Sequence, residues 1–515
     1  MSTLALVAPS TEKLTALERL ETLCDPGSLQ LVRSAVRSTR MGERTSPNDG
    51  VIGATGLVGG RPVACYAQDP TYVGGSLGEV QAETICRVLR AAARGRMPVV
   101  SFIESAGARL QEGVAALAGY GRIFNENVAL SGQVPQISVI CGPSAGGGSY
   151  SPALTDFVVM TAAASMFLTG PSVVKEVMGE DVDAATLGGA RIHDRNGVCQ
   201  LGAGSDIEAI WLVRELLDHL PQHATEAPRR LPVVAPAEGP SDRAVPDEKR
   251  KVYDVRDVVR TLVDGGRLLE VSPRWARNML TGFARIDGRA VGIVANQPHY
   301  LGGVLDAQAA TKGARFVRTC DLYGIPLVVL VDTPGFLPGT SQEKVGVIRH
   351  GAKLVHAFAA ATVPSDGRAA QGLRRGVHRD EQPRARRRPR ARLAAGPARR
   401  HGRPAGGRPR PPPRARRGRR PGGGAHPPGR GVRARLPHGG ERRARGRHRR
   451  DRRPRAHAWA DRGCVASARR RGADRLGEPQ HPAVSQRPTP RPGAGFNRPS
   501  TRRPSRRSSR RRAAR

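Results

Sequence analysis

Residues 60–80 read GRPVACYAQDPTYVGGSLGEV, and residues 288–308 read GRAVGIVANQPHYLGGVLDAQ. Both stretches begin with Gly-Arg and carry Tyr-x-Gly-Gly in the same register, so adding 228 to a residue number in the first gives its counterpart in the second. The same offset, without a gap, takes Pro98 to Pro326 and the string ESAG (104–107) to DTPG (332–335). The chain therefore holds two copies of one unit.

The pattern within each copy predicts an α/β fold. Short β-rich runs alternate with helical patterns from 51 to 221, as at 99–103, 114–130 and 137–141. Such alternation is typical of strands joined by crossover helices. Leucines at helical spacing predict an amphipathic opening helix within 11–23. Residues 222–250 are rich in proline and charged residues and have no periodic pattern, which predicts a linker between the copies. Pockets form readily between two such domains, so the functional site is expected between the copies.

The charge of the chain is concentrated at one end. The 84 Lys plus Arg and 44 Asp plus Glu residues give a net charge of +40. Residues 365–515 alone contain 48 Arg, no Lys and 8 acidic residues, so they account for the whole excess and 1–364 are neutral. The front of the chain is therefore not expected to bind nucleic acid or a membrane as a basic protein would.

The remaining composition favours a cytoplasmic protein. No apolar run has the length of a membrane span, and the short run at 4–8 lacks the features of a signal peptide. The seven cysteines are scattered singly, with no C-x-x-C pair, which favours buried thiols in a reducing compartment over a zinc or dithiol site.

Two glycine motifs imitate known sites. The string GATGLVG (53–59) looks like a dinucleotide-binding run, but it leads straight into the β-rich stretch 63–67, and Asp287-Gly288 in the second copy indicates a hairpin turn instead. The string GPSAG (142–146) fits the nucleophile elbow of serine hydrolases. No convincing Asp and His partners follow it, so a serine hydrolase is not expected.

The glycines at 146–148 predict an anion-stabilising turn. The string GPSAGGGSYSP (142–152) follows the apolar run 137–141 and enters a helical segment at 153–160. Glycines between a strand and a helix leave backbone N–H groups unshielded, at the positive end of the helix dipole. One glycine would serve a tight turn alone, whereas three in a row favour close approach of a ligand and an oxyanion hole.

With these motifs in view, the chain resembles the β (carboxyltransferase) subunit of acyl-CoA carboxylases, the propionyl- and acetyl-CoA carboxylase family. The strings that carry the resemblance are GGSLGEV (74–80), ESAGARLQEG (104–113), GPSAGGGSYSPALTDFVVM (142–160), FLTGP (167–171), LGGARIH (187–193), VGIVANQP (291–298), KGARFVRTCD (312–321) and VDTPGFLPGTSQE (331–343). They cover nearly all of residues 24–364. The resemblance implies a crotonase-like ββα-superhelix fold in each copy.

The resemblance also implies a reaction. It transfers a carboxyl group from biotin, carried on a biotin carboxylase and biotin carrier partner (the α subunit), to the α-carbon of a short acyl-CoA, without a metal. The homo-oligomer would be a hexamer assembled from dimers, with the first copy of one subunit facing the second copy of its neighbour. CoA would lie on the first copy and biotin on the second. An oxyanion hole in each copy would stabilise the anions of the reaction.

The resemblance assigns residues to these roles. Gly146 and Gly147 would donate N–H groups to the thioester enolate. Acyl-CoA contacts are expected at Ala106, Gly107, Ala108, Arg109, Asn296, Gln297 and Pro298. The biotin side is expected to include Gly335, Phe336 and Leu337. For Arg109, a contact with CoA phosphates and a surface or helix-end position are equally compatible with the sequence.

The resemblance stops within a residue of Pro364. Back-translating 365–383, with each new codon begun at the second base of the old one, permits the string LTVVLRKAYGGAFIAMNS, which is what the family has next. The two glycines of that string fall at the codons of Arg374 and Arg375, which are Gly146 and Gly147 plus 228. We therefore interpret 365–515 as an out-of-frame, disordered basic tail, and the second copy as incomplete and its oxyanion hole as lost.

The resulting expectation divides the chain into an N-terminal helix (1–23), a first carboxyltransferase domain (24–221), a linker (222–250), an incomplete second domain (251–364) and the tail (365–515). Two other functions stay open: a biotin-dependent acyl-CoA decarboxylase subunit, which shares the two halves, and a nucleic-acid-binding protein acting through its arginines. Aromatic residues interleaved with the charges would favour the latter, but the tail has only Trp459 and Phe496.

Overall fold

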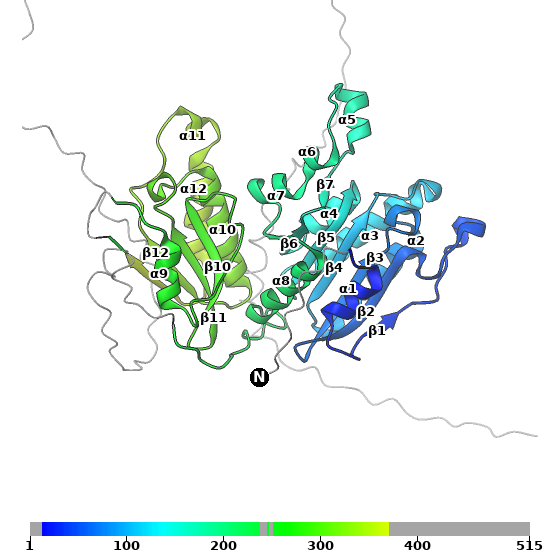
Figure 1. Ribbon diagram of the computed structural model, residues 1–515, viewed down its shortest axis with the longest axis horizontal. Coiled ribbons are helices and arrows are strands. Elements are labelled where there is room, and N and C mark those ends of the chain that lie inside the picture. The colour runs from blue at the N-terminus through cyan, green and yellow to red at the C-terminus, as the bar shows by residue number, and fades with distance from the viewer. Residues whose placement is uncertain (1–12, 237–244, 247–250, 370–515) are drawn as a thin grey trace, which may run out of the picture. The chain divides into compact units, whose positions relative to one another are not determined.

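The computed structural model describes residues 13–236, 245–246 and 251–369 (Figure 1). In the first half, the strands are β1 (Gln30–Val32), β2 (Val51–Val58), β3 (Arg61–Gln68), β4 (Val99–Ser105), β5 (Gln136–Ala145), β6 (Phe157–Thr161), β7 (Ser165–Phe167) and β8 (Leu201–Ala203). The helices are α1 (Ala16–Leu23), α2 (Glu79–Gly95), α3 (Val114–Leu130), α4 (Gly147–Ala153), α5 (Pro171–Met178), α6 (Ala184–Gly188), α7 (Ala190–Asn196) and α8 (Asp206–His219). Short 3₁₀ turns are η1 (Thr39–Arg44), η2 (Pro47–Gly50), η3 (Val73–Gly75) and η4 (Leu110–Glu112).

These strands form one mixed sheet in the order β1-β2-β3-β4-β5-β6-β8, with β7 paired to the far end of β5. The first three strands are antiparallel, and β3 to β8 are parallel. Gly59 and Gly60, both with positive φ, close the β2–β3 hairpin, so the glycine run at 53–59 lies in a strand and its turn, and the dinucleotide motif is excluded as expected. The predicted α/β architecture is confirmed.

The sheet is buried on both faces. Helices α2 and α3 cover one face, where Leu89 and Ile123 pack among strand residues such as Tyr66. Helices α1 and α8 cover the other, where Leu20 and Val213 join residues of β3 to β6. Because both faces are covered, β4 is buried along its whole length.

Helix α1 is held to the sheet by buried charges. It begins at Ala16 rather than near residue 11, because the side chain of Thr15 caps the helix and forms a capping box with Glu18. Arg19 is fully buried and pairs with Asp206 (2.8 Å), at the start of α8, and with Glu104 (3.2 Å), near the end of β4. Lys13 also contacts Glu104. The opening helix is therefore an integral part of the first half.

The second half repeats the architecture. Its strands are β9 (Leu268–Glu270), β10 (Met279–Ile286), β11 (Arg289–Asn296), β12 (Leu327–Val331) and β13 (Ser365–Ala369), in the order β13-β12-β11-β10-β9. Its helices are α9 (Val255–Leu262), α10 (Ala307–Leu322), α11 (Thr340–Lys344) and α12 (Val347–Ala360), with a 3₁₀ turn η5 (Leu301–Gly303). Strands β10 and β11 and turn η5 match β2, β3 and η3 residue for residue at an offset of 228, and α10 starts at that offset from α2.

The expectation that this offset holds without a gap is wrong beyond β12. Helix α12 begins at Val347, five residues later than the offset takes the start of α3. The parallel register also slips, because Val99 pairs with Gln136 whereas Leu327 pairs with Ser365 and not with residue 364. The extra residues form the segment around α11, so the second copy carries a longer connection after Gly335.

The proposed boundary at residue 364 also needs correction. Residues 365–369 form β13, which pairs in parallel with β12, so the strand that was expected to be missing is present at least in backbone. Its first three residues, Ser365, Asp366 and Gly367, are exposed, and Val328, Val329 and Val331 of β12 are only half buried. Strand pairing uses backbone groups, so β13 can pair with β12 despite its polar side chains. Burying the apolar side chains of β12 would require apolar neighbours, which β13 does not supply. The expected disordered tail from 370 onward lies outside the described residues.

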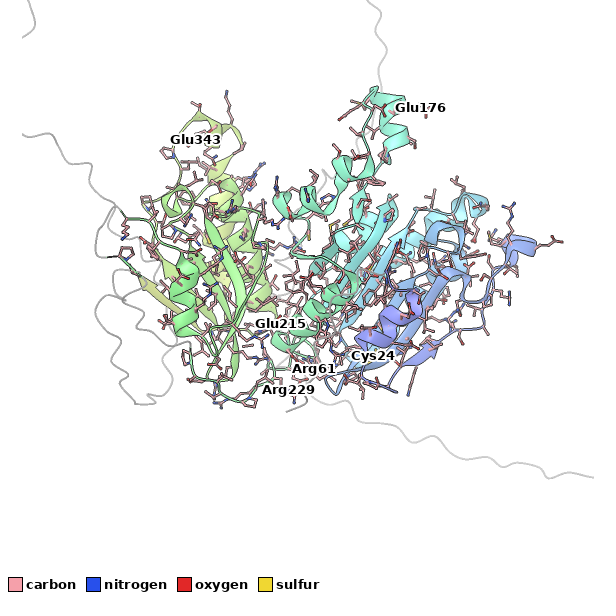
Figure 2. The ribbon with its side chains drawn as sticks, in the orientation of Figure 1. Cys24, Arg61, Glu176, Glu215, Arg229 and Glu343 are labelled. Atoms are coloured by element: carbon pink, nitrogen blue, oxygen red, sulfur yellow. The ribbon has the colours of Figure 1, made fainter. Side chains whose placement is uncertain are left out.

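The two halves share an aromatic joint. Phe283 of β10 is fully buried and lies 5.9 Å, ring centre to ring centre, from Phe157 of β6 and 5.0 Å from Phe316 of α10. The imidazole of His219, the last residue of α8, stacks on Phe283. The start of the predicted linker runs beside both halves: Arg229 donates to the carbonyl of Gly59, and the Leu231 N–H donates to that of Gly288 (Figure 2).

Within the described residues, none of the helices combines the length and the apolar character that crossing a bilayer requires.

His219 predicts how stability depends on pH. Burial lowers the pKa of its imidazole from 6.5 to about 3, because the charged form loses its hydration at the joint. Between these two pKa values, His219 binds a proton in the unfolded chain but not in the folded one. The free energy of unfolding therefore decreases as pH falls below 6.5. Between pH 7 and pH 5 this loss is about 2 kcal/mol. Denaturant unfolding at both pH values should show that His219→Gln loses less stability on acidification by this amount, and parallel behaviour of the two proteins would contradict it.

Candidate active site

The glycine turn lies where β5 leaves the sheet. Gly146 has φ 57° and ψ −122°, a conformation that side chains with a Cβ do not tolerate, and it caps the N-terminus of α4. Strand β5 therefore turns into α4 within one residue. The strand and the glycine turn lie where 137–148 predicted them, but the helix predicted at 153–160 is wrong: α4 spans Gly147–Ala153, and Phe157–Thr161 form strand β6.

Tyr120 of α3 lies directly beneath this turn. A Cβ on Gly147 would come within 2.6 Å of its ring, so no larger residue fits at 147. Burial raises the pKa of the Tyr120 hydroxyl to about 12, and this hydroxyl lies 3.4 Å from that of Ser105. Phe124 packs beside Tyr120, and Tyr150 meets Phe124 edge-on. The turn thus rests on an aromatic cluster of neutral groups.

The structure corrects the set of donors. The N–H of Gly146 donates to the carbonyl of Phe167 in β7 (3.0 Å), so it is already occupied and cannot serve a ligand. The N–H groups of Gly147 and Gly148 open the first turn of α4 and meet no acceptor within the described part of the chain. Of the two predicted donors, Gly147 is open and Gly146 instead fixes the turn.

The predicted acyl-CoA segment 106–108 lies beside the turn. Gly107 has φ 99°, and a Cβ there would lie 3.4 Å from the carbonyl oxygen of Ala145. The Ala106 N–H donates to the carbonyl of Gly74, and the Leu77 N–H to that of Gly107. The repeated Tyr-x-Gly-Gly turn therefore holds the segment against the glycine turn, and the exposed Ala106 lies at the surface there.

Arg109 lies at a helix end, as the N-cap of η4, but its side chain is not at the surface. Its side chain is 1% exposed, and it pairs with Asp49 and Glu112 at 2.7 Å each. It also donates to the carbonyls of Asp49 and Ser76. An arginine enclosed by these partners cannot reach a CoA phosphate. It ties η2, η3 and η4 together and thereby supports the 106–108 segment from within.

Asn296, Gln297 and Pro298 are also buried, and their expected contact with acyl-CoA stays a prediction. The Asn296 amide donates to the carbonyl of Gly303 and accepts from the Asp332 N–H. The side-chain N–H of Gln297 donates to the carboxylate of Asp254, and its side-chain oxygen accepts from the N–H of Val255. Their hydrogen bonds are used inside the second half, where they brace the loops next to Gly335.

The residues expected on the biotin side are more accessible. The Gly335 carbonyl accepts from the Leu305 N–H, and the Leu337 N–H donates to the Leu305 carbonyl, so this loop repeats the pairing of 107–109 with Leu77. Phe336 is 46% exposed, and its ring lies against Gly351 of α12. The second half therefore presents an aromatic face at the position equivalent to Ala108.

The serine of GPSAG is not a nucleophile. Ser144 is completely buried inside β5, where it pairs with Ser105 and Met166, so no substrate reaches its hydroxyl. This agrees with the rejection of a hydrolase. In the ranges that the structure describes, no three His, Cys, Asp or Glu side chains gather closely enough to hold a metal ion.

Three supporting residues were missed from the sequence: Tyr120, Ser149 and His193. The Ser149 hydroxyl lies within hydrogen-bonding distance of the carbonyls of Ser144 (2.6 Å) and Phe167 (3.1 Å). Tyr120 and His193 lie 27 and 46 residues away from Gly147 along the chain, and nothing local marks their proximity. The presence of the glycines at 147 and 188 was the available signal, since each is needed for close contact with one of them.

Arg109 gives a prediction that separates its two roles. Arg109→Met should lower the free energy of unfolding by about 3–5 kcal/mol, because Asp49 and Glu112 would stay buried without their partner. The matched control is Arg40→Met, which breaks the exposed pair with Glu79 and should cost less than about 1 kcal/mol. Chemical denaturation measures both. Unchanged stability with a large loss of CoA affinity would restore the phosphate-binding role.

Comparisons with known proteins show the family of the chain. The family model of the carboxyl transferase domain matches residues 9–365. The propionyl-CoA carboxylase β chain of Saccharopolyspora erythraea is 49% identical over 369 residues, covering 68% of each chain. The methylmalonyl-CoA decarboxylase subunit α of Veillonella parvula is 46% identical over 364 residues, covering 68% of this chain and 71% of its own.

Among solved structures, a transcarboxylase 12S hexamer with methylmalonyl-coenzyme A bound superposes with a TM-score of 0.68, at 47% identity over 70% of this chain and 71% of that one. The likeness spans both halves and ends where the basic stretch begins. The chain belongs to the carboxyl transferase domain family.

Proposed function

We propose that this chain is the carboxyltransferase subunit of a biotin-dependent acyl-CoA carboxylase, and that its first half binds a short acyl-CoA. The observation that carries the proposal is the turn at 146–148. Two backbone N–H groups are open there, at the start of a helix, over a floor of neutral aromatic groups. The named relatives act on propionyl-CoA or methylmalonyl-CoA, which supports a short acyl chain.

The turn suits one step of this chemistry. When the α-proton of a thioester is removed, negative charge moves onto the carbonyl oxygen. The Gly147 and Gly148 N–H groups would donate to that oxygen, and each such donor is worth about 2.7–4 kcal/mol of barrier. Tyr120 keeps its proton, because its pKa is about 12. The hydroxyls of Ser105 and Ser144 are buried. The resemblance to the carboxylase family implies that the base is the biotin anion.

The second half fits biotin only in part. Bound carboxybiotin would supply the carboxyl group and the base. Gly335 and the exposed Phe336 offer a surface for its ring system. No glycine pair stands at the equivalent positions: the offset of 228 gives Arg374 and Arg375, and the register of β13, one residue later, gives Arg375 and Gly376. We therefore propose that the present chain binds acyl-CoA without transferring the carboxyl group.

The frame interpretation belongs to this proposal. The family match ends at residue 365, next to the point where the lysine-free, arginine-rich composition begins. In the first half, β6 and β8 continue the sheet beyond β5, β7 pairs with the far end of β5, and α4 follows it. In the second half, β13 is the last strand of the described residues and leaves β12 half exposed. A complete second half would require an apolar strand and a glycine turn, which back-translation of 365–383 in another reading frame permits.

We further propose that the biotin is carried by a separate α subunit and that the complete protein assembles as a hexamer. The transcarboxylase 12S structure is described as a hexamer assembly in a multienzyme core, which supports this arrangement.

A decarboxylase subunit is the second candidate. The Veillonella parvula relative, a methylmalonyl-CoA decarboxylase subunit α, supports it at nearly the same identity as the carboxylase subunits. The two reactions run over the same enolate in opposite directions, so the glycine turn serves both. The direction is decided by which biotin-carrying partner restores turnover to a frame-corrected chain.

Gly147 offers a direct test of the thioester site. Gly147→Ala should weaken propionyl-CoA binding by tenfold or more, because the new Cβ would collide with the Tyr120 ring and displace the donors. Calorimetry on the full chain measures the affinity. Gly121→Ala is the matched control, since a Cβ at 121 meets nothing within 4 Å and the variant should bind as the parent does. Equal binding by all three proteins would remove the turn from the site.

Restoring the frame after Pro364 tests the second half. The corrected chain should transfer carboxyl to propionyl-CoA in the presence of a biotin-carrying partner, because it regains a strand and a glycine turn. The present chain should show no turnover in the same assay. Robust turnover by the uncorrected chain, or none by the corrected one on acetyl-, propionyl- or butyryl-CoA, would contradict the proposal.

A further inference from the structure

His193 lies outside the glycine turn but is linked to it through one short strand. Its Nε2 lies 2.8 Å from the carbonyl oxygen of Met166 in β7. Its Nδ1 lies 3.2 Å from the side-chain amide nitrogen of Asn196. Since that amide donates, Nδ1 accepts and the proton is on Nε2, which donates to Met166. The imidazole thus holds β7 from the side opposite β5.

Strand β7 is in turn the anchor of the glycine turn. Met166 and Phe167 pair in parallel with Ser144 and Ala145 at the end of β5. The Phe167 carbonyl accepts from the Gly146 N–H (3.0 Å) and from the Ser149 hydroxyl (3.1 Å). One carbonyl therefore fixes both sides of the turn, the residue before the open donors and the residue after them.

The contact of His193 with β7 depends on a glycine. A Cβ on Gly188 would come within 2.0 Å of the Met166 carbonyl and 3.2 Å of His193 Nε2. The residue at 188 must therefore leave room for this hydrogen bond. The side chain of His193 reaches from α7 to the strand, and it belongs to no metal-binding cluster within the described residues.

We propose that His193 and Ser149 are positioning residues of the thioester site, which hold β7 so that the Gly147 and Gly148 N–H groups point at the thioester oxygen. His193 acts through Met166 and Phe167, and the Ser149 hydroxyl acts between the carbonyls of Ser144 (2.6 Å) and Phe167 (3.1 Å), which lie on neighbouring strands. The inference rests on the proposed acyl-CoA function. It assigns to the LGGARIH segment the task of fixing the direction of the two donors.

The test compares two ligands on the full chain by calorimetry: propionyl-CoA, and S-propyl-CoA, which lacks the thioester carbonyl. The parent should prefer propionyl-CoA by about tenfold, the worth of a hydrogen bond of about 1.4 kcal/mol. In His193→Ala that preference should fall to about twofold or less, with the affinity for S-propyl-CoA unchanged. His193→Gln, whose amide can donate to Met166, should keep the preference. Arg191→Ala, an exposed residue of the same helix, is the matched control.

The outcomes separate this inference from the function on which it rests. If the parent binds neither ligand, the proposed function fails and the inference with it. If the parent shows the preference and His193→Ala keeps it, or loses affinity for both ligands equally, the positioning role alone is overturned. Should His193→Ala not fold, Ser149→Ala carries the same test, because it removes the second donor to Phe167 and should also lower the preference.

Discussion

The site depends on the way that the chain leaves β5. Gly146 takes a conformation open only to glycine, and Gly147 lies so close to Tyr120 that a methyl group would not fit. These two constraints turn the strand into α4 with its first N–H groups uncovered. The rest of the first half serves this turn. Arg109 stabilises the neighbouring loop from inside, β7 fixes the backbone of Gly146, and the aromatic cluster keeps the floor free of titrating groups. The chemistry of such a site lies in the backbone, which explains why its motif consists of glycines rather than acids and bases.

The repeat made much of the fold predictable. Hairpins, 3₁₀ turns and the first helix of the second half follow from the first half at one offset, because backbone geometry at Tyr-x-Gly-Gly is the same in both. The prediction failed where the copies differ in length, around α11, since nothing in the sequence marks where an inserted turn is accommodated. The site was predicted well where it consists of glycines and poorly where it consists of side chains. Arg109 and Gln297 look like surface ligands in a motif, and only the three-dimensional contacts show that their polar groups are already paired. Gly146 shows the same limit of sequence reasoning, because its N–H donates to the carbonyl of Phe167, which lies 21 positions further along the chain.

The two halves differ most at their last common strand. In the first half, β4 lies between β3 and β5 and is buried throughout. In the second, β12 has a neighbour on each side but three of its five residues stay half exposed, because β13 begins with Ser, Asp and Gly. Hydrogen bonding between strands is thus satisfied while packing is not. The pairing of β12 with β13 keeps the sheet topology but lacks the hydrophobic stabilisation that an apolar strand would contribute.

The ion pair between Arg19 and Asp206 also bears on the order in which the chain folds during synthesis. Its partners are 187 residues apart, so at 5–20 residues per second the ribosome needs roughly 10–40 s between making the two. Until Asp206 has been synthesised, Arg19 lacks one of its ion-pair partners, and the packing of α1 on the sheet stays incomplete. The closing contact is nevertheless available well before codon 364 is read. The first half can therefore complete its own structure on the ribosome whatever sequence the remaining codons specify, and a change of frame late in the message leaves this half of the protein untouched.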